Sequence, residues 1–112
     1  MSSTLFTPYK LGPVTLRNRT IRSAAFESMG KDFGPTRQLK DYHVAVARGG
    51  VGMTTLAYAA VCRSGLSFNK QLWLRPEIVP GLREITDAVH REGAAAAIQI
   101  GHCGNMTHWT TA

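Results

Sequence analysis

The chain has 112 residues, of which 44% are hydrophobic and 18% are charged. A chain of this length forms at most one domain, and its composition is typical of a globular protein rather than a disordered one. The net charge is +6, but the basic residues are scattered along the sequence. Aromatic side chains do not interleave with them as a nucleic-acid surface requires, so we expect no nucleic-acid partner.

The sequence carries no visible targeting or membrane segment. Residues 1–4 have neither a basic start nor an apolar core, so no secretory signal is expected. The stretch after Glu92 is uncharged, but its Gly, Gln, Asn and Thr residues argue against a membrane span. The two cysteines, Cys62 and Cys103, are too few for a disulfide framework. We therefore expect a cytoplasmic protein with reduced thiols.

The first half of the chain predicts a hairpin, a strand and a helix. Residues 9–16 form two short apolar arms around a Gly-Pro pair, which is typical of a hairpin. Residues 20–25 predict the first strand of the main body. Thr36 can cap a helix that runs to about residue 48, where two glycines end it. Five residues at helical spacing predict its buried face: Leu39, Tyr42, His43, Val46 and Ala47.

The second half predicts two more strands around a second helix. Residues 51–57 form a continuous apolar run with β-branched residues, which indicates a strand covered on both faces. A long connection is expected over residues 58–76, and loops of that length tend to be functional. Residues 78–92 predict a helix that ends at Gly93, and residues 94–100 predict a third buried strand.

Strands that alternate with helices indicate right-handed crossovers and a parallel sheet. Three strands fit a doubly wound sheet and a (β/α)8 barrel equally well, and in both folds ligands bind at the carboxyl ends of the strands. These ends are residues 23–26, 57–58 and 99–102. No Gly-x-Gly-x-x-Gly motif follows the first strand, which favours the barrel.

Six short motifs, in order over almost the whole chain, resemble the amino-terminal part of the old yellow enzyme family of FMN-dependent oxidoreductases. They are Leu5-Phe6-x-Pro8, Leu16-Arg-Asn-Arg19, Pro35-Thr36, Gly49-Gly-Val-Gly52, Thr86-Asp-Ala-Val-His90 and Ile98-Gln-Ile-Gly-His-Cys-Gly104. Each motif is weak alone, and their order makes the match specific.

The resemblance implies that residues 1–112 are the amino-terminal portion of one FMN-binding barrel domain. The fold class expected is α/β, an incomplete (β/α)8 TIM barrel with an amino-terminal hairpin, about three strands and two helices. The family passes hydride from NADH or NADPH through FMN to an activated alkene or a related small-molecule acceptor. Its substrate-anchoring pair, tyrosine proton donor and phosphate loops match nothing before Ala112, so no catalytic residue is assigned. The chain alone is expected to be inactive.

The resemblance also implies roles for residues at the strand ends. Those expected to bind FMN are Ser23, Ala24, Ala25, Phe26, Tyr58 and Gln99, and those on the substrate side are Ser28 and His102. Gln99 would bond the pyrimidine edge of the flavin, because its amide both donates and accepts hydrogen bonds. Phe26 and Tyr58 depart from the family pattern, which has a threonine or cysteine and a small residue at these places.

Two alternatives stand beside this reading. His102, Cys103 and His108, with Cys62 as a fourth ligand, are metal-binding residue types, but their spacing fits no standard zinc pattern, so no metal is expected. In the second alternative, the chain is a non-catalytic remnant that persists as a homo-oligomer or with a partner that supplies the missing strands. His43 and His90 are expected to be partly exposed on their helices.

Overall fold

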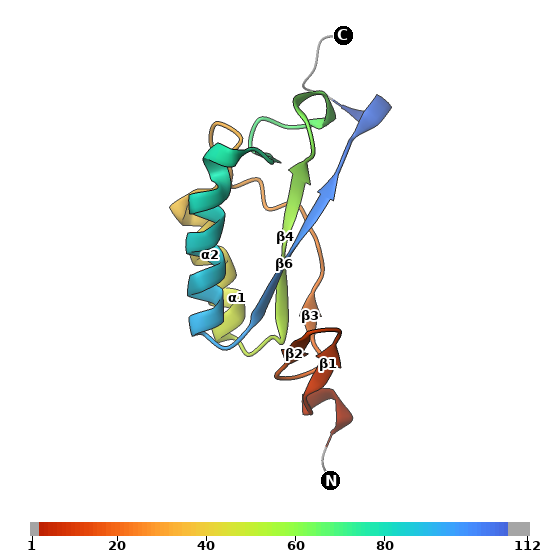
Figure 1. Ribbon diagram of the computed structural model, residues 1–112, viewed down its shortest axis with the longest axis vertical. Coiled ribbons are helices and arrows are strands. Elements are labelled where there is room, and N and C mark those ends of the chain that lie inside the picture. Colours follow the sequence, from red (N-terminus) through yellow and green to blue (C-terminus); the bar gives the residue numbers. More distant parts are fainter. Residues whose placement is uncertain (1–2, 108–112) are drawn as a thin grey trace.

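The computed structural model describes residues 3–107, which form one α/β layer pair preceded by a hairpin (Figure 1). The strands are β1 (Tyr9–Leu11), β2 (Val14–Leu16), β3 (Ile21–Arg22), β4 (Met53–Ala60), β5 (Leu72–Trp73) and β6 (Ala95–Gly101). The helices are α1 (Arg37–Arg48) and α2 (Val79–Arg91), with short 3-10 helices at Thr4–Phe6, Arg63–Gly65, Pro76–Ile78 and Gly104–Met106. Figure 1 shows both long helices on one side of the main sheet.

The main sheet is parallel, as the alternation of strands and helices predicts. β4 is its central strand and pairs along one edge with β3 and β5 and along the other with β6. Met53 pairs with Ile21 on one side and with Ala95 on the other. The order β3, β4, β6 across the sheet places strands that follow one another along the chain side by side, with α1 and α2 in the connections between them.

The helices begin and end where their sequence signals predict. The Thr36 hydroxyl accepts a hydrogen bond from the Leu39 backbone N–H (3.1 Å) and caps α1. Pro80 lies in the first turn of α2 and leaves no helical hydrogen bond unmade there. Gly93 follows α2 with φ +89°, a left-handed conformation that L side chains rarely adopt.

The hydrophobic core lies between the two helices and the sheet. Its buried members are Leu39, Ala47, Leu56, Ala59, Leu72, Ile85, Val89 and Ala94. Fully burying one of the larger aliphatic side chains stabilises the fold by about 2 kcal/mol. We call this sheet face the helix-covered face. Because side chains alternate along a strand, Thr55, Ala97 and Gln99 point to the other side, which we call the open face.

The structure corrects the expected strand boundaries. The first strand covers only Ile21–Arg22, and the second continues through Ala60 instead of stopping at residue 57. The connection expected over residues 58–76 therefore contains strand β5, which pairs Ala59 with Leu72. A two-residue strand has too short a pattern to be detected from sequence.

His43 is also placed differently from the prediction. His43 belongs to α1, and its side chain is fully buried at 0% exposure. His90 is exposed, as expected. A buried imidazole requires hydrogen-bond partners on both ring nitrogens. His43 has both, in Glu27 and Thr54.

Candidate functional site

Strands β4 and β6 end near the top of the sheet in Figure 1, whereas β3 pairs only with Met53 and Thr54 at the start of β4 and ends in the lower half. The segment after β3 reaches the second half of β4, where the Ala57 N–H donates to Glu27. Ser23 and Ala25 follow β3 and are exposed, while Ala24 between them is half-buried. Gln99 is near the end of β6 and is also exposed. Within residues 3–107 its amide has no hydrogen-bond partner. This end of the sheet therefore offers small side chains and one free amide to a ligand.

Phe26 is part of an aromatic cluster. Its ring centroid lies 5.1 Å from that of Tyr58 and 5.2 Å from that of Phe68, with which it stacks. The cluster joins the segment after β3, the end of β4 and the loop before β5. Phe26 thus forms an apolar wall, consistent with its lack of a hydrogen-bonding group.

Tyr58 has a polar environment at its hydroxyl. Burial raises the pKa of Tyr58 above the ordinary value of 10.0, and negative charge on Cys103 and a hydrogen bond with Cys103 raise it further. A hydrogen bond with Ser67 acts in the opposite direction. Tyr58 therefore ties the end of β4 to the loop before β5 and to the segment after β6.

Glu27, which was not assigned a role from sequence, organises the buried side of this region. Its Oε2 lies 2.5 Å from His43 Nε2 on α1 and 3.5 Å from Arg22 Nη1. The other ring nitrogen, His43 Nδ1, is 2.7 Å from the Thr54 hydroxyl on β4. The Glu27 and His43 side chains are 1% and 0% exposed. Buried ionisable groups of this kind must be paired, and these are.

The Glu27 carboxylate also accepts a backbone hydrogen bond in the irregular part of β4. The ladder between β4 and β6 shifts register between Leu56 and Ala59, and the Ala57–Tyr58 peptide there is cis. The Ala57 N–H donates to Glu27 Oε1 (3.1 Å) instead of to a strand. Glu27 thus fixes the backbone at the end of β4. In the sequence, the one indication of a buried carboxylate was His43, which lies on the apolar face of its helix and requires a hydrogen-bond partner when buried.

The two proposed substrate-side residues, Ser28 and His102, belong to different segments, one after β3 and the other after β6. Ser28 is exposed in a left-handed conformation (φ 57°), just after Glu27. His102 is exposed after β6, with Nε2 3.2 Å from the Ser64 hydroxyl and Nδ1 accepting from the Gly104 N–H at 2.9 Å. Their substrate contacts remain predictions.

The metal alternative receives no structural basis in residues 3–107, where no group of three or more His, Cys, Asp or Glu side chains is placed to hold an ion. His108, one of the candidate ligands, lies outside the described residues. In the same part of the chain, no helix is long and apolar enough to cross a bilayer.

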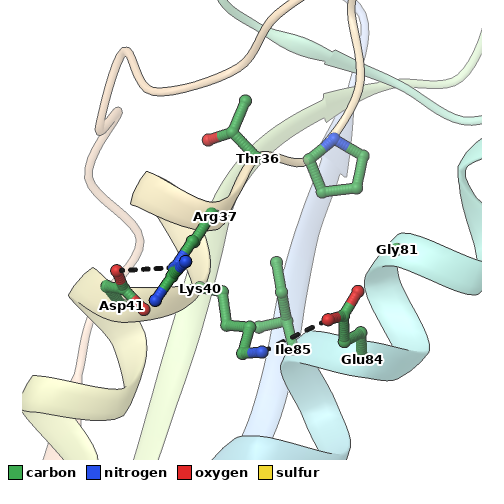
Figure 2. A pocket seen from close by; sticks show the side chains of 8 residues that line it. Thr36, Arg37, Lys40, Asp41, Gly81, Glu84 and Ile85 are labelled. Atoms are coloured by element: carbon green, nitrogen blue, oxygen red, sulfur yellow. Dashed lines mark hydrogen bonds and ion pairs between the residues drawn. The ribbon is translucent and has the colours of Figure 1, made fainter.

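A pocket of about 310 Å³ lies elsewhere, between the first turns of α1 and α2 (Figure 2). Charged side chains line it, but they are paired: Arg37 with Asp41 (3.8 Å) and Lys40 with Glu84 (3.2 Å). None of the predicted site residues contributes to it. We therefore place the candidate site at the strand ends.

The strand ends suit a flat heteroaromatic group with a polar edge, such as the flavin of FMN. Ser23 and Ala25 leave backbone and small side chains open to close approach. The free Gln99 amide offers a donor and an acceptor together. The fold is thus that of a parallel β/α protein, a class in which ligands bind at the carboxyl ends of the strands.

Residues 4–110 match the NADH:flavin oxidoreductase / NADH oxidase family, and the chain belongs to this family. It is 48% identical over 100 residues to the 4,4'-dithiodibutanoate disulfide reductase of Rhodococcus erythropolis, covering 89% of this chain and 25% of that enzyme. It is also 48% identical over 107 residues to a probable N-methylproline demethylase of Rhizobium meliloti (strain 1021), covering 94% of this chain and 16% of that protein.

Solved structures are similar over the same region. A 2-naphthoyl-CoA reductase complex superimposes with a TM-score of 0.89 at 25% identity, covering 94% of this chain and 16% of that one. Morphinone reductase in complex with tetrahydroNAD gives a TM-score of 0.84 at 25% identity, covering 96% and 29%. The chain thus spans less than a third of the length of these relatives.

These matches confirm the resemblance to old yellow enzymes and the α/β fold of their amino-terminal part. The expected cofactors, FMN with NADH or NADPH, are those of the family.

Proposed function

We propose that this chain supplies the amino-terminal part of an FMN-dependent oxidoreductase that acts on a small-molecule acceptor. FMN, when bound, accepts hydride from NADH or NADPH and passes it on, in the family's typical case to an activated alkene. The observation that carries the proposal is the free Gln99 amide on the open face, beside strand ends made of small residues.

Each residue then has a physical role toward the flavin. Gln99 donates to and accepts from the alternating carbonyl and N–H groups of the pyrimidine edge. Ser23, Ala24 and Ala25 allow the ring to approach the backbone of the strand end. Phe26 and Tyr58, held against each other at 5.1 Å, shape an apolar wall and exclude water from it.

Ser28 and His102 are proposed to lie on the acceptor side, since both are exposed beyond the ends of their strands. The relatives act on different compounds by their names, a disulfide, an N-methyl amino acid and an acyl-CoA among them. What these proteins share is the family, so the shared flavin chemistry supports our proposal more directly than any one acceptor.

The experiment is a chimera in which this chain replaces the matching quarter of the Rhodococcus erythropolis disulfide reductase. We expect the chimera to bind FMN, with the flavin absorbance band, and to oxidise NADH or NADPH. The natural reductase is the positive control, and this chain alone is expected not to turn over. A folded chimera without flavin contradicts the proposal.

A second candidate function follows from the open face. Ile21 there is 48% exposed, beside the half-buried Met53 with which it is in register. A sheet face of this kind gains stability when another chain covers it. The chain would then be a non-catalytic module completed by a second copy or a partner. Light scattering separates the two: a folded, flavin-free dimer favours this function, and a monomer contradicts self-association.

A further inference from the structure

The segment that follows β3 is held in place by side chains at its two ends. Residues 23–30 form neither helix nor strand, so no sheet ladder fixes their position. We call residues 23–26, which are proposed to bind FMN, the flavin-facing segment. Arg22 comes directly before it and Glu27 directly after it. Their side chains meet, with Arg22 Nη1 3.5 Å from Glu27 Oε2, and are 17% and 1% exposed. A largely buried ion pair therefore joins the two ends of the flavin-facing segment.

Each member of this ion pair also binds the backbone of β4. Arg22 Nη1 donates to Thr55 O (2.6 Å), and the Ala57 N–H donates to Glu27 Oε1 at 3.1 Å and Oε2 at 3.3 Å. Arg22 Nη2 in addition donates to Ala25 O (3.0 Å), inside the flavin-facing segment. Hydrogen bonds in which one partner is ionised are shorter and stronger than neutral ones. The ion pair thus fixes the flavin-facing segment against β4 at both ends.

Helix α1 orients the ion pair from a third direction. His43 Nε2 lies 2.5 Å from Glu27 Oε2, and the Tyr42 hydroxyl lies 3.3 Å from Arg22 Nη2. The Arg22 guanidinium also lies over the Tyr42 ring, 5.1 Å from its centroid. His43 is held in turn by the Thr54 hydroxyl, 2.7 Å from Nδ1. Because packing and hydrogen bonds hold both charged groups, their geometry is preorganised.

The ion pair acts directly on the apolar wall made by Phe26 and Tyr58. The two ring centroids are 5.1 Å apart, and the Glu27 carboxylate accepts from the N–H of the residue before Tyr58. The ring contact and this hydrogen bond join the same two segments of the chain. A hydrogen bond weakens steeply with distance and angle, whereas an aromatic pair is favourable over a range of separations. The carboxylate therefore sets the spacing of the wall more sharply than the rings do.

We propose that Arg22 and Glu27 are positioning residues of the FMN site. They hold the flavin-facing segment against β4 and so set the place of Phe26 relative to Tyr58. The inference rests on the proposed function, because the site that they position is the flavin site. Neither side chain needs to touch the flavin, since each acts through backbone groups of the flavin-facing segment and of β4.

The first test measures FMN affinity in the chimera by flavin fluorescence. Glu27→Ala should weaken FMN binding about tenfold, in line with the loss of a hydrogen bond to a charged group. Ile85→Ala is the matched control, because Ile85 is 1% exposed in the core and belongs to no part of the ion pair. It should lower stability but leave the FMN affinity of the folded protein within about twofold. Equal weakening in both variants overturns the proposal, since FMN binding would then follow stability alone.

The second test asks whether the hydrogen bond to β4 is what matters at Glu27. In Glu27→Gln the amide oxygen still accepts from the Ala57 N–H, and the NH2 group donates to His43 Nε2 once the ring proton moves to Nδ1 and faces the Thr54 oxygen. We expect FMN affinity within about threefold of the parent chimera, because a neutral hydrogen bond replaces a charged one. A folded Glu27→Gln chimera as weak as Glu27→Ala contradicts the positioning role.

The third test changes the other end of the flavin-facing segment and leaves the bonds of Glu27 to α1 and β4 in place. Arg22→Met should weaken FMN binding about fivefold, because two backbone oxygens lose their donor. Arg48→Met is the control, since its pair with Glu92 is on the surface and its side chain is 68% exposed. Equal FMN affinity in Arg22→Met and Arg48→Met contradicts the role of Arg22.

The parent chimera separates this inference from the proposed function. A folded parent that binds no FMN contradicts the proposed function itself. A parent that binds FMN, with the same affinity in folded Glu27→Ala and Arg22→Met, contradicts only the positioning role.

Discussion

The helix-covered face of the sheet and the carboxyl ends of its strands differ in whether their polar side chains have hydrogen-bond partners within the protein. On the helix-covered face, Glu27, His43 and Thr54 are buried and bonded to one another. At the carboxyl ends of the strands, Gln99 is exposed without a partner in residues 3–107, and Cys62 is exposed with its Sγ 3.2 Å from the Ser64 hydroxyl. Groups that are satisfied internally stabilise a fold, and groups left open are available to ligands.

The largest expected effect is that of Glu27→Ala on the helix-covered face. It leaves His43, Arg22 and the Ala57 N–H without their shared acceptor, and breaking such a buried pair costs about 3 kcal/mol or more. Urea denaturation measures the loss. Glu84→Ala is the matched control, because that carboxylate is 67% exposed and its pair with Lys40 contributes about 0.5 kcal/mol. Equal losses of stability in Glu27→Ala and Glu84→Ala would contradict the claim that the buried pair stabilises the fold more than the exposed pair.

Ile85 and Ile21 provide a matched pair of isoleucines for the same comparison. Ile85 is 1% exposed in the core, and Ile21 is 48% exposed on the open face. Ile85→Ala should cost about 3 kcal/mol, since a cavity remains where the side chain was. Ile21→Ala should cost less than about 1 kcal/mol. A larger loss at Ile21, measured by the same denaturation, would show that the open face is covered in solution.

Gln99→Leu should separate binding from stability. In the chimera we expect FMN affinity, followed by flavin fluorescence, to fall about tenfold, because the polar edge of the ring loses its amide partner. The free energy of unfolding should change by less than about 0.5 kcal/mol. Gln38→Leu, on the exposed surface of α1, is the control that should alter neither. Unchanged FMN affinity in Gln99→Leu contradicts the assigned role.

The smallest effect concerns Tyr58 and alkaline pH. Because its pKa is raised in the folded chain, the folded state holds the hydroxyl proton more tightly than the unfolded state. That contribution to stability is complete below the ordinary pKa of 10.0 and is lost as pH rises through the folded value. Tyr58→Phe should therefore lose less stability than the natural chain between about pH 9 and about pH 11. An identical decline in both proteins would contradict the assignment.

The periodic parts of this fold are predictable from sequence because long apolar patterns determine them. α1 and α2 begin and end within one or two residues of their predicted bounds, since Thr36 and Gly93 mark the ends chemically. The parallel order of β3, β4 and β6 follows from the alternation of elements. The two-residue strand β5 has no period to detect.

The candidate site is predictable only in part, because its residues meet through space. The strand ends were predictable, but residues 94–100 were predicted to form a buried strand, and Gln99 near its end is exposed. Glu27 and His43 are 16 residues apart, and only the packing of α1 on β4 brings them within 2.5 Å. The link from Cys62 through Ser64 to His102 likewise depends on the pairing of β4 with β6.

The most direct measurement for the central claim is hydrogen exchange of the chimera with and without FMN. If the carboxyl edge of the sheet binds the flavin, FMN should slow exchange in segments 22–27, 56–62 and 98–104. Exchange on the exposed surfaces of α1 and α2 should not change. Protection confined to the helices, or none at the strand ends in a chimera that binds FMN, would contradict the proposed site.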